Sequence, residues 1–448
     1  MGQASSKNNN HLERKLTLVP LFMIIVADMV GSGIFTTSGF IMQDLKSPPA
    51  MLLCWLIGGL LALTGALCYG ELGAMFPASG GDYVFLRESF GKRIAFLSGW
   101  ISLLVGFSAP IAAIAIAFGN YFNGALPVGL LPLGTPTVLA VIIIIIFTCV
   151  HAQDLVFGVW THIFFTVGKI IIIMLLVTVG LIYGNGTFEH FESSFKISDI
   201  FSGGFATSLI FVSFAYSGWN ASVYLGSEIK NAGRNIPLSI ISATVFVIFA
   251  YILLNIVYIY AVNPSDMYGV EDIGSLAASK LFGNKIGSLF GLAIAFCLLS
   301  SLSSMIMLGP RVYHAMSKDK LFFALFSNIN HKHHVPTYSI ILQAGIAILL
   351  VCTSTFYAIL IYVGFILSIF ASLTVIGMMI LRKKSPSLLR PYKAWGYPLT
   401  PILFVGINIW IVIFSIRNNL TAFIWGLVTI VVGLVAYEWF ERRTKTSN

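Results

Sequence analysis

The sequence predicts an all-α integral membrane protein with twelve transmembrane helices: a five-plus-five inverted repeat with broken helices 1 and 6, plus two extra helices. Two observations lead to this fold class. Hydrophobic residues make up 57% of the 448 residues and charged residues only 10%, whereas a soluble domain carries roughly 25% charged residues. In addition, small and polar residues interrupt two of the hydrophobic segments, at 31–35 and at 216–220.

Apolar stretches of about 20 residues, the length that crosses a bilayer as a helix, define the twelve spans. Their approximate ranges are 16–43, 50–76, 94–122, 136–151, 155–183, 202–227, 237–262, 285–311, 336–354, 357–381, 398–416 and 420–438. Two short helices are expected outside the spans. One is an interfacial helix in the mixed-charge run 82–93, and the other is an amphipathic helix at 273–282.

The net charge of +9 is explained by membrane topology. With the N-terminus placed inside, 20 of the 26 Lys and Arg residues fall in segments on that side, and Lys169 lies within a span. Cytoplasmic loops carry the excess of positive charge in membrane proteins. The distribution therefore predicts a multi-pass protein of the cell membrane with both termini in the cytoplasm, and no nucleic acid is expected as a partner.

The residue types and spacings give no sign of a cofactor. The five cysteines form no Cys-x-x-Cys pair, so neither a disulfide framework nor a zinc site is predicted. A cluster of His331, His333 and His334 lies in a basic loop, where solvated histidines are expected rather than metal ligands. Because no phosphate loop or nucleophile–base pair stands out either, we expect no enzymatic activity.

The spans divide into two halves that each open with an interrupted helix. The interruptions begin 185 residues apart (216 − 31), about one five-helix repeat, and an odd number of spans inverts the second half in the membrane. The expected divisions are a cytoplasmic tail (1–15), the first repeat (16–201), the second repeat (202–382), a cytoplasmic connector (383–397), helices 11 and 12 (398–440) and a second cytoplasmic tail (441–448).

Gly31, Ser32, Gly33 and Ile34 form the first predicted break. A helix that unwinds in lipid frees N–H and C=O groups, so breaks occur where these groups face protein, water or a ligand. The free N–H groups at the start of the next half-helix, together with its positive dipole end, favour a carboxylate. Packing of small residues against another helix is the alternative explanation.

The second predicted break lies in the sixth span. Carbonyl groups at the end of the preceding half-helix can accept hydrogen bonds from an ammonium group, and aromatic side chains can wall a pocket, although ordinary aromatic packing also explains them. The residues assigned to this part of the site are Phe214, Ala215, Tyr216, Ser217, Gly218 and Trp219. Two matched breaks favour a secondary transporter that holds a zwitterion between them at the bilayer midplane.

Lys169 places a cation about 14 residues into the span 155–183, roughly 20 Å of helix from either end. Because its side chain cannot reach the interface over that distance, a buried structural or coupling cation is predicted. The expected partners are serines of the eighth span, although packing through small residues also explains this run. These serines are Ser300, Ser301, Ser303 and Ser304.

Asp28 lies about one helical turn before the first break. A carboxyl group there can carry a transported proton, recognise a cationic substrate or cap polar groups. Two other acidic residues, Glu71 and Glu228, lie near the cytoplasmic ends of spans. We expect them to pair with arginines on that side of the membrane.

Several segments match known motifs, namely 31–35, 71–77, 79–81, 214–220, 228–231, 234–237, 309–313 and 390–398. Through them the sequence resembles the amino acid–polyamine–organocation (APC) superfamily of transporters, in particular its L-type amino acid transporter branch and bacterial amino acid permeases. The resemblance spans nearly the whole chain, and the sixth-helix motif is its most specific part.

The resemblance implies an α-amino acid held between the two broken helices and carried by alternating access. In relatives a fifth-helix lysine replaces the sodium ion of sodium-coupled transporters and bridges helices 1 and 8. Lys169 matches that position, which implies sodium-independent exchange or proton-linked symport, and Phe214 matches a gating aromatic residue. Eukaryotic L-type members pair with a glycoprotein through an external cysteine. Because residues 120–136 hold no cysteine, a monomer or weak homodimer is expected.

The sequence thus predicts a transporter of L-amino acids, with neutral ones favoured. The family is expected to carry an apolar or small residue where this chain has Asp28. That departure leaves open a transporter of cationic amino acids or amines, or an exchanger of an amino acid for its decarboxylated product. A non-transporting amino acid sensor on the same fold is the remaining alternative.

Overall fold

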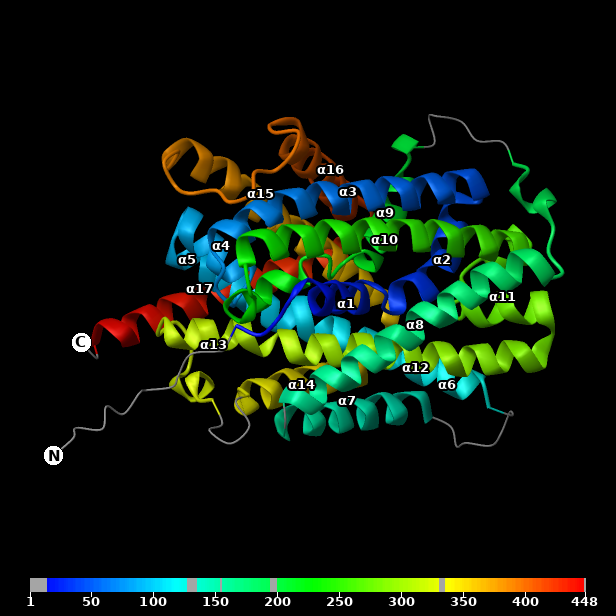
Figure 1. Ribbon diagram of the computed structural model, residues 1–448, viewed down its shortest axis with the longest axis horizontal. Coiled ribbons are helices and arrows are strands. Elements are labelled where there is room, and N and C mark those ends of the chain that lie inside the picture. Colours follow the sequence, from blue (N-terminus) through cyan, green and yellow to red (C-terminus); the bar gives the residue numbers. More distant parts are fainter. Residues whose placement is uncertain (1–13, 127–134, 154, 194–199, 330–334, 447–448) are drawn as a thin grey trace.

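The described part of the chain is a bundle of long helices (Figure 1). The computed structural model describes residues 14–126, 135–153, 155–193, 200–329 and 335–446. Among these residues the only β-structure is a single bridge between Leu16 and Ile229. The predicted all-helical fold class is confirmed, whereas the histidine cluster at 331–334 lies outside the described residues.

The first half of the bundle opens with a helix in two pieces. Its elements are α1 (Leu18–Met29), α2 (Ser32–Leu45), α3 (Pro48–Met75), α4 (Asp82–Phe90), α5 (Lys92–Ile101), a π-helical stretch (Ser102–Ser108), α6 (Ala109–Gly124), α7 (Thr135–Gln153), α8 (Leu155–Tyr183) and the 3-10 turn η2 (Phe188–Phe191). The short helix α4 falls within the mixed-charge run where an interfacial helix was expected, and ends before Gly91.

The second half also opens with an interrupted helix. Its elements are α9 (Gly203–Ala215), the 3-10 segment η4 (Ala221–Glu228), α10 (Ala232–Ala261), η5 (Pro264–Met267), α11 (Ile273–Phe282), α12 (Asn284–Leu308), α13 (Pro310–Lys318), η6 (Ala324–Ser327), α14 (Thr337–Thr353) and α15 (Phe356–Lys384). Two further helices, α16 (Leu399–Asn418) and α17 (Leu420–Thr446), follow.

Ten helices of the described residues are long and apolar enough to cross a membrane, and they coincide with ten of the twelve expected spans. The sixth and ninth spans correspond to shorter apolar helices, α9 and α14. Helix α9 is short because the chain leaves the helix after Ala215. The third short apolar helix, α11, coincides with the amphipathic helix expected between two spans.

Local signals in the sequence explain several helix starts and ends. Helix α9 begins after Ser202, whose side chain accepts a hydrogen bond from the N–H of Phe205 at 3.1 Å. Helix α15 begins in the same way after Thr355, and its last turn carries three basic residues, which suit the negative end of the helix dipole. The break between α11 and α12 falls at Gly283, which has a positive φ of 90°.

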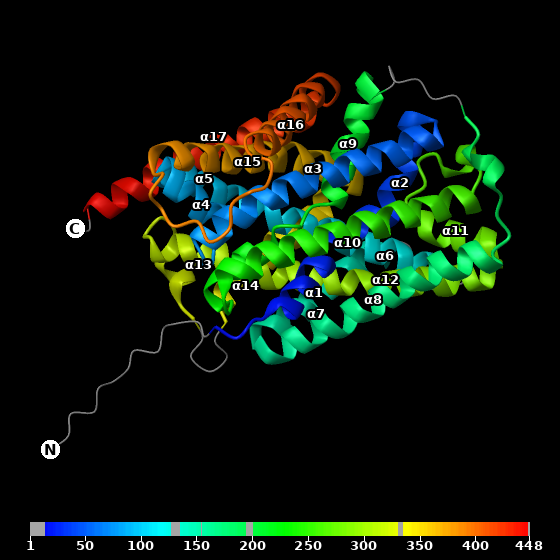
Figure 2. The same cartoon turned by 45° about the horizontal axis from the view of Figure 1, so that its top comes forward.

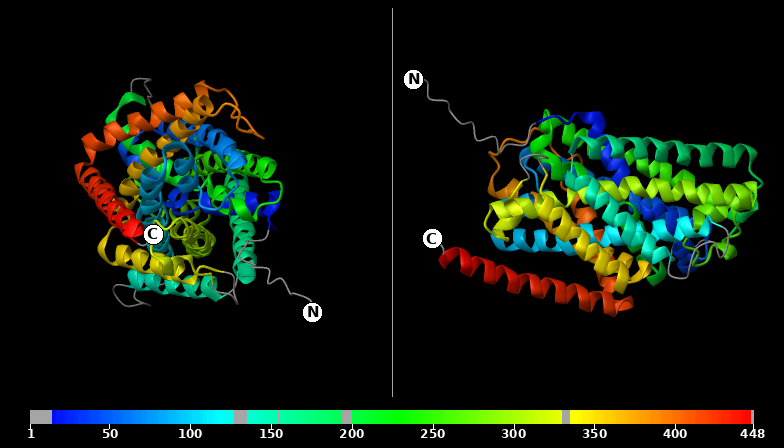
Figure 3. Two further views of the ribbon diagram at one scale, coloured as in Figure 1. Left: turned by 90° about the vertical axis from the view of Figure 1, so that its left-hand side faces the viewer. Right: turned by 90° about the horizontal axis from the view of Figure 1, so that it is seen from below.

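Helix α1 begins and helices α15 and α17 end at the same end of the bundle, on the left in Figure 1. We call it the basic end because Arg87, Arg311, Arg382 and Arg390 form ion pairs there. Helices α16 and α17 lie on the outside of the bundle, where they pack against each other and against α15 (Figures 2 and 3).

Buried acidic groups hold segments together at the basic end. Glu71, at the end of α3, pairs with Arg382 and with Arg390 and accepts a hydrogen bond of 2.7 Å from the N–H of Ala394. Glu228 accepts a hydrogen bond of 2.8 Å from Nε of Arg311. The predicted pairing of both acids with arginines is confirmed, and Glu71 fixes the connector 383–397 against α3.

Candidate functional site

The first helix breaks at Val30 and Gly31. Helix α1 ends at Met29 and α2 begins at Ser32, so the interruption lies at the start of the predicted break, and Ser32 and Gly33 already belong to α2. Gly31 donates its N–H to the carbonyl of Met29 at 2.8 Å, a tight turn that ends the helix. The last carbonyls of α1 and the first N–H groups of α2 therefore lack partners within their own helices.

The ammonium group of Lys169, a residue of α8, lies at the carbonyl end of α1. Its side chain is fully buried, and Nζ donates to the carbonyl of Ala27 at 3.1 Å, to the carbonyl of Val30 and to Oγ of Ser301 at 2.7 Å. Oγ of Ser301 lies within hydrogen-bond distance of the same two carbonyls, at 2.7 Å and 2.9 Å. A cation at the carbonyl end of a helix is stabilised by the helix dipole, so Lys169 holds α1 to α8 and α12.

Of the serines proposed as partners of Lys169, only Ser301 contacts it. Ser300 donates to the carbonyl of Cys297 in its own helix at 3.1 Å, and Ser303 shares a hydrogen bond of 2.8 Å with Nε2 of His151. Oγ of Ser304 is buried and has no hydrogen-bond partner among the described residues. The four serines of α12 thus serve different purposes.

Tyr251 of α10 joins the two breaks, and the sequence analysis missed it. Its hydroxyl lies 2.6 Å from the carbonyl of Met29 and 2.9 Å from the carbonyl of Ala215, the last residues of α1 and α9. The single hydroxyl proton is shared between these two acceptors. No signal in the sequence separates this tyrosine from the others of an apolar span.

The second break extends from Tyr216 to Asn220. Helix α9 ends at Ala215, and the chain then turns through Ser217, whose N–H donates to the carbonyl of Phe214 at 2.9 Å. Gly218 has a positive φ of 95°, and a Cβ atom there would lie 2.7 Å from Oδ2 of Asp28. Only glycine fits this position, because the backbone has a left-handed conformation there and the carboxylate of Asp28 leaves no room for a Cβ atom.

The two broken helices lie directly against each other. A Cβ atom on Gly33 would lie 2.4 Å from Cα of Ala215, so α2 and the end of α9 are in backbone contact. A Cβ atom on Gly31 would lie 3.6 Å from Oγ of Ser301, which is an ordinary contact distance. Gly33 therefore allows close packing of helices, the alternative that the sequence left open, whereas Gly31 does not need to be a glycine for that reason.

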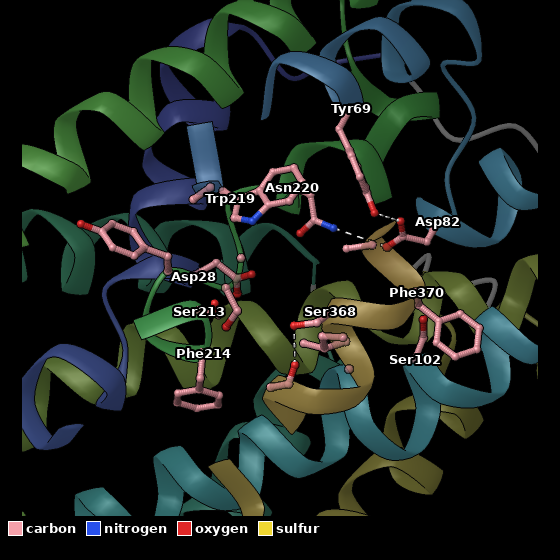
Figure 4. Close-up of a pocket in the computed structure, with 18 of the residues that line it drawn as sticks. Asp28, Tyr69, Asp82, Ser102, Ser213, Phe214, Trp219, Asn220, Ser368 and Phe370 are labelled. Atoms are coloured by element: carbon pink, nitrogen blue, oxygen red, sulfur yellow. Dashed lines mark hydrogen bonds between the residues drawn. The ribbon is translucent and has the colours of Figure 1, made fainter. Parts of the chain in front are cut away.

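A cavity of about 120 Å³ lies beside the second break (Figure 4). An apolar cavity of about 150 Å³ holds a benzene molecule, so the volume suits one small organic molecule. The lining includes six of the predicted site residues: Asp28, Phe214, Tyr216, Ser217, Gly218 and Trp219. It does not include Gly31, Ser32, Gly33, Ile34 or Ala215, nor Lys169 and the serines of α12 (Ser300, Ser301, Ser304).

Several buried oxygen atoms near the breaks have no hydrogen-bond partner among the described residues. Three of them belong to residues that line the cavity: Oδ1 of Asp28, Oγ of Ser213 and the hydroxyl of Tyr216. Oγ of Ser32, in the first turn of α2, is a fourth. Because buried polar groups are normally paired, unpaired oxygens gathered at one place indicate a site for a polar ligand or water.

Asp82, a residue absent from the sequence predictions, closes the side of the cavity toward the basic end. It accepts hydrogen bonds from Tyr69, from Tyr224 at 2.8 Å, from Thr374 at 3.0 Å and from Asn220 at 3.4 Å. These donors come from α3, η4, α15 and the second break, and Figure 4 shows Asp82 across the cavity from Asp28. Burial raises the pKa of the Asp82 carboxyl above its usual range.

The other side of the breaks is filled by side chains. The rings of Phe40, Phe211 and Tyr357 pack with centroids 5.6 Å to 5.8 Å apart, from α2, α9 and α15. The N–H of Gly269 donates to the carbonyl of Gly39 at 3.1 Å, which ties α2 to the segment before α11. The cavity accordingly lies on the basic side of the breaks.

The described geometry contains no group of histidines, cysteines or acids that could hold a metal ion. The fold is that of a multi-pass membrane protein with a small internal cavity beside the second of two broken helices. A sequence model of the amino acid permease family matches residues 16–436. The chain belongs to this family, within the APC superfamily, and is thus a permease rather than an enzyme.

Known proteins are similar over almost the full length of the chain. The large neutral amino acids transporter small subunit 2 of Mus musculus is 29% identical over 433 residues, which cover 95% of this chain and 81% of that protein. The b(0,+)-type amino acid transporter 1 of Homo sapiens is 28% identical over 451 residues, covering 98% of this chain and 90% of that protein. The predicted resemblance to the L-type branch is confirmed.

Proposed function

We propose that this protein is a secondary active transporter that carries L-amino acids by sodium-independent exchange or proton-linked symport. The observation that carries the proposal is the cavity of about 120 Å³ beside two broken helices in contact. Unwound backbone in a membrane is tolerated where it lines a polar site, and paired breaks are typical of transporters whose substrate lies at the midplane.

The two charged ends of an amino acid find complementary groups at the breaks. The first N–H groups of α2 and the hydroxyl of Ser32, which has no partner among the described residues, suit the α-carboxylate. The carbonyl groups at the end of α9 and the hydroxyl of Ser213 suit the α-ammonium group. Ser32 and Gly33 lie outside the lining of the cavity in this conformation, and the contact of α2 with α9 at Gly33 brings the two sets of groups close together.

The aromatic and small residues of the cavity walls suit the apolar part of an amino acid side chain. Phe214 and Trp219 line it from the second break, and small residues such as Gly58 and Ala62 line it from α3. Phe214 is the residue we assign as a gate, because it lines the cavity at the end of α9, about one helical turn after Phe211 of the ring cluster.

Lys169 supports the sodium-independent part of the proposal. Two carbonyls and one hydroxyl surround its Nζ, and these are the oxygen groups with which a small cation would otherwise be coordinated. A covalently attached ammonium group fills that place permanently. Sodium is then not needed to hold α1 against α8 and α12.

The arrangement in the membrane completes the proposal. We place the basic end in the cytoplasm of a cell-membrane protein, since positive charge gathers on the cytoplasmic side. The halves 16–201 and 202–382 then act as inverted repeats that expose the site alternately to each side. With the cavity on the basic side of the breaks, the present conformation is the one nearer to opening inward.

Counterflow in proteoliposomes tests the proposal. Vesicles loaded with an unlabelled amino acid are expected to accumulate the same labelled amino acid transiently, and a panel of amino acids defines the substrates. Imposing a pH gradient without internal amino acid separates proton symport from exchange. Binding of amino acids without any movement across the membrane would overturn the proposal in favour of a sensor.

A further inference from the structure

The charges around the cavity are all of one sign. Among the described residues that line it, the only charged side chains are Asp28 and Asp82, and no Lys, Arg or His side chain is present. The lining also includes eight aromatic residues: Tyr69, Phe107, Phe214, Tyr216, Trp219, Tyr224, Phe370 and Phe404. Carboxylates and aromatic faces are the two kinds of group that attract an organic cation.

The two carboxylates differ in what already surrounds them. Asp82 accepts hydrogen bonds from four side chains on the side of the cavity toward the basic end. Asp28, in contrast, is only 5% exposed, and its Oδ1 has no hydrogen-bond partner among the described residues. Figure 4 shows Asp28 and Ser213 together on the side of the cavity opposite Asp82.

The nearest buried cation does not neutralise Asp28 by direct contact. The ammonium group of Lys169 is bound to the carbonyls of Ala27 and Val30 and to Ser301, none of which lines the cavity. Lys169 itself is also absent from the lining. A buried carboxylate that forms no ion pair with a described residue carries a large desolvation cost, which a cationic ligand removes.

We infer that Asp28 is the counter-ion for a cationic side chain of the substrate, so that the site selects amino acids whose side chains carry an amine or a guanidinium. The inference rests on the proposed function and specifies its substrate class. The α-carboxylate and α-ammonium groups remain at the breaks, and the side chain extends between the aromatic walls. The contact of Oδ2 with Gly218 places the carboxylate directly beside the second break.

Uptake of labelled lysine, ornithine and leucine into proteoliposomes tests the inference with the whole protein. Asp28→Asn is expected to reduce lysine uptake about 100-fold, because a buried charge-assisted contact is lost, and to change leucine uptake less than about threefold. A thermal midpoint in detergent equal to that of the wild type shows that the variant is folded. Asp82→Asn removes the other carboxylate of the cavity and is expected to affect lysine and leucine alike.

A second variant tests the geometry independently of charge. Asp28→Glu keeps the carboxylate but moves it one methylene further into the cavity, so the preference is expected to shift from lysine toward ornithine, whose side chain is one methylene shorter. Equal losses of lysine and leucine uptake in Asp28→Asn would overturn the inference, because Asp28 would then meet the α-ammonium group. Wild-type uptake of leucine with no binding of lysine or ornithine would overturn it as well.

The proposed function and this inference fail in different ways. Binding of lysine that depends on Asp28, without any transport, would contradict the transport function and leave the counter-ion role of Asp28 intact. Transport of neutral amino acids alone would contradict the counter-ion role and leave the transport function intact.

Discussion

The two breaks of this protein interrupt similar apolar helices, yet their freed backbone groups have different fates. At the first break, Lys169, Ser301 and Tyr251 hold the carbonyls of Ala27, Met29 and Val30, and none of these residues lines the cavity. At the second break, Tyr216, Ser217, Gly218, Trp219 and Asn220 all line it. The first break is a fixed joint inside the protein, whereas the second borders the cavity in which we propose that the substrate binds.

This difference separates two roles that a broken helix can have. Internal partners make the first break a permanent part of the fold, because unsatisfied carbonyls in the membrane cost too much free energy. The glycine and aromatic residues of the second break line the cavity, where a ligand can supply hydrogen-bond partners that the protein does not. Variants at the two breaks are therefore expected to give different losses, of stability at the first and of ligand binding at the second.

The largest effect is expected from Lys169→Met. The carbonyls of Ala27 and Val30 then keep only Ser301 as a donor, and we expect a loss of about 3 kcal/mol in stability together with loss of transport. The thermal midpoint in detergent measures the loss, with Gly168→Ala, at a position with open space, as the neighbouring control. A stable Lys169→Met protein would mean that α1 does not need this cation.

Gly33→Ala is expected to have the next largest effect. The added methyl group would lie 2.4 Å from Cα of Ala215, so the backbones of α2 and α9 must separate, at a cost of about 2 kcal/mol. Gly406→Ala, in α16 with no atom near the new methyl group, is the matched control and should be neutral or slightly stabilising. If both variants melt alike, the breaks are not in the close contact described.

Tyr251→Phe removes the one hydroxyl that hydrogen-bonds to carbonyls at both breaks. The carbonyls of Met29 and Ala215 lose their shared donor, so a loss of about 1–2 kcal/mol in stability is expected. The ring remains to pack against Trp55 and Tyr216, which keeps the cavity volume unchanged. If the binding free energy of the amino acid falls by more than the free energy of unfolding, the hydroxyl of Tyr251 belongs to the binding site and not to the contact between the breaks.

The smallest effect concerns pH and Asp82. Burial raises the pKa of this carboxyl, so the folded protein keeps the proton to a higher pH than the unfolded chain does. Stability therefore falls as pH rises above about 4, the ordinary pKa of an Asp carboxyl, and Asp82→Asn lacks this dependence. The difference between the melting temperatures of the wild type and of Asp82→Asn, measured over a range of pH, gives the size of this dependence. An opposite slope would show that the four donors hold the carboxyl ionised.

Local sequence predicted the fold and both breaks well, because apolar length and glycine-rich interruptions are properties of neighbouring residues. The structural role of Lys169 could also be predicted from the sequence, since a cation in the middle of a span needs a buried partner. Tyr251 was not, because its acceptors lie 36 and 222 residues away in the chain. Asp82 was missed for the same reason, as its donors come from four separate segments.

The central claim is that Lys169 holds the first break in place of sodium while an amino acid binds beside the second. Counterflow of a labelled amino acid, measured with sodium and again with choline in its place on both sides of the membrane, tests it most directly. The account predicts equal initial rates in the two media. A rate that requires sodium would contradict it.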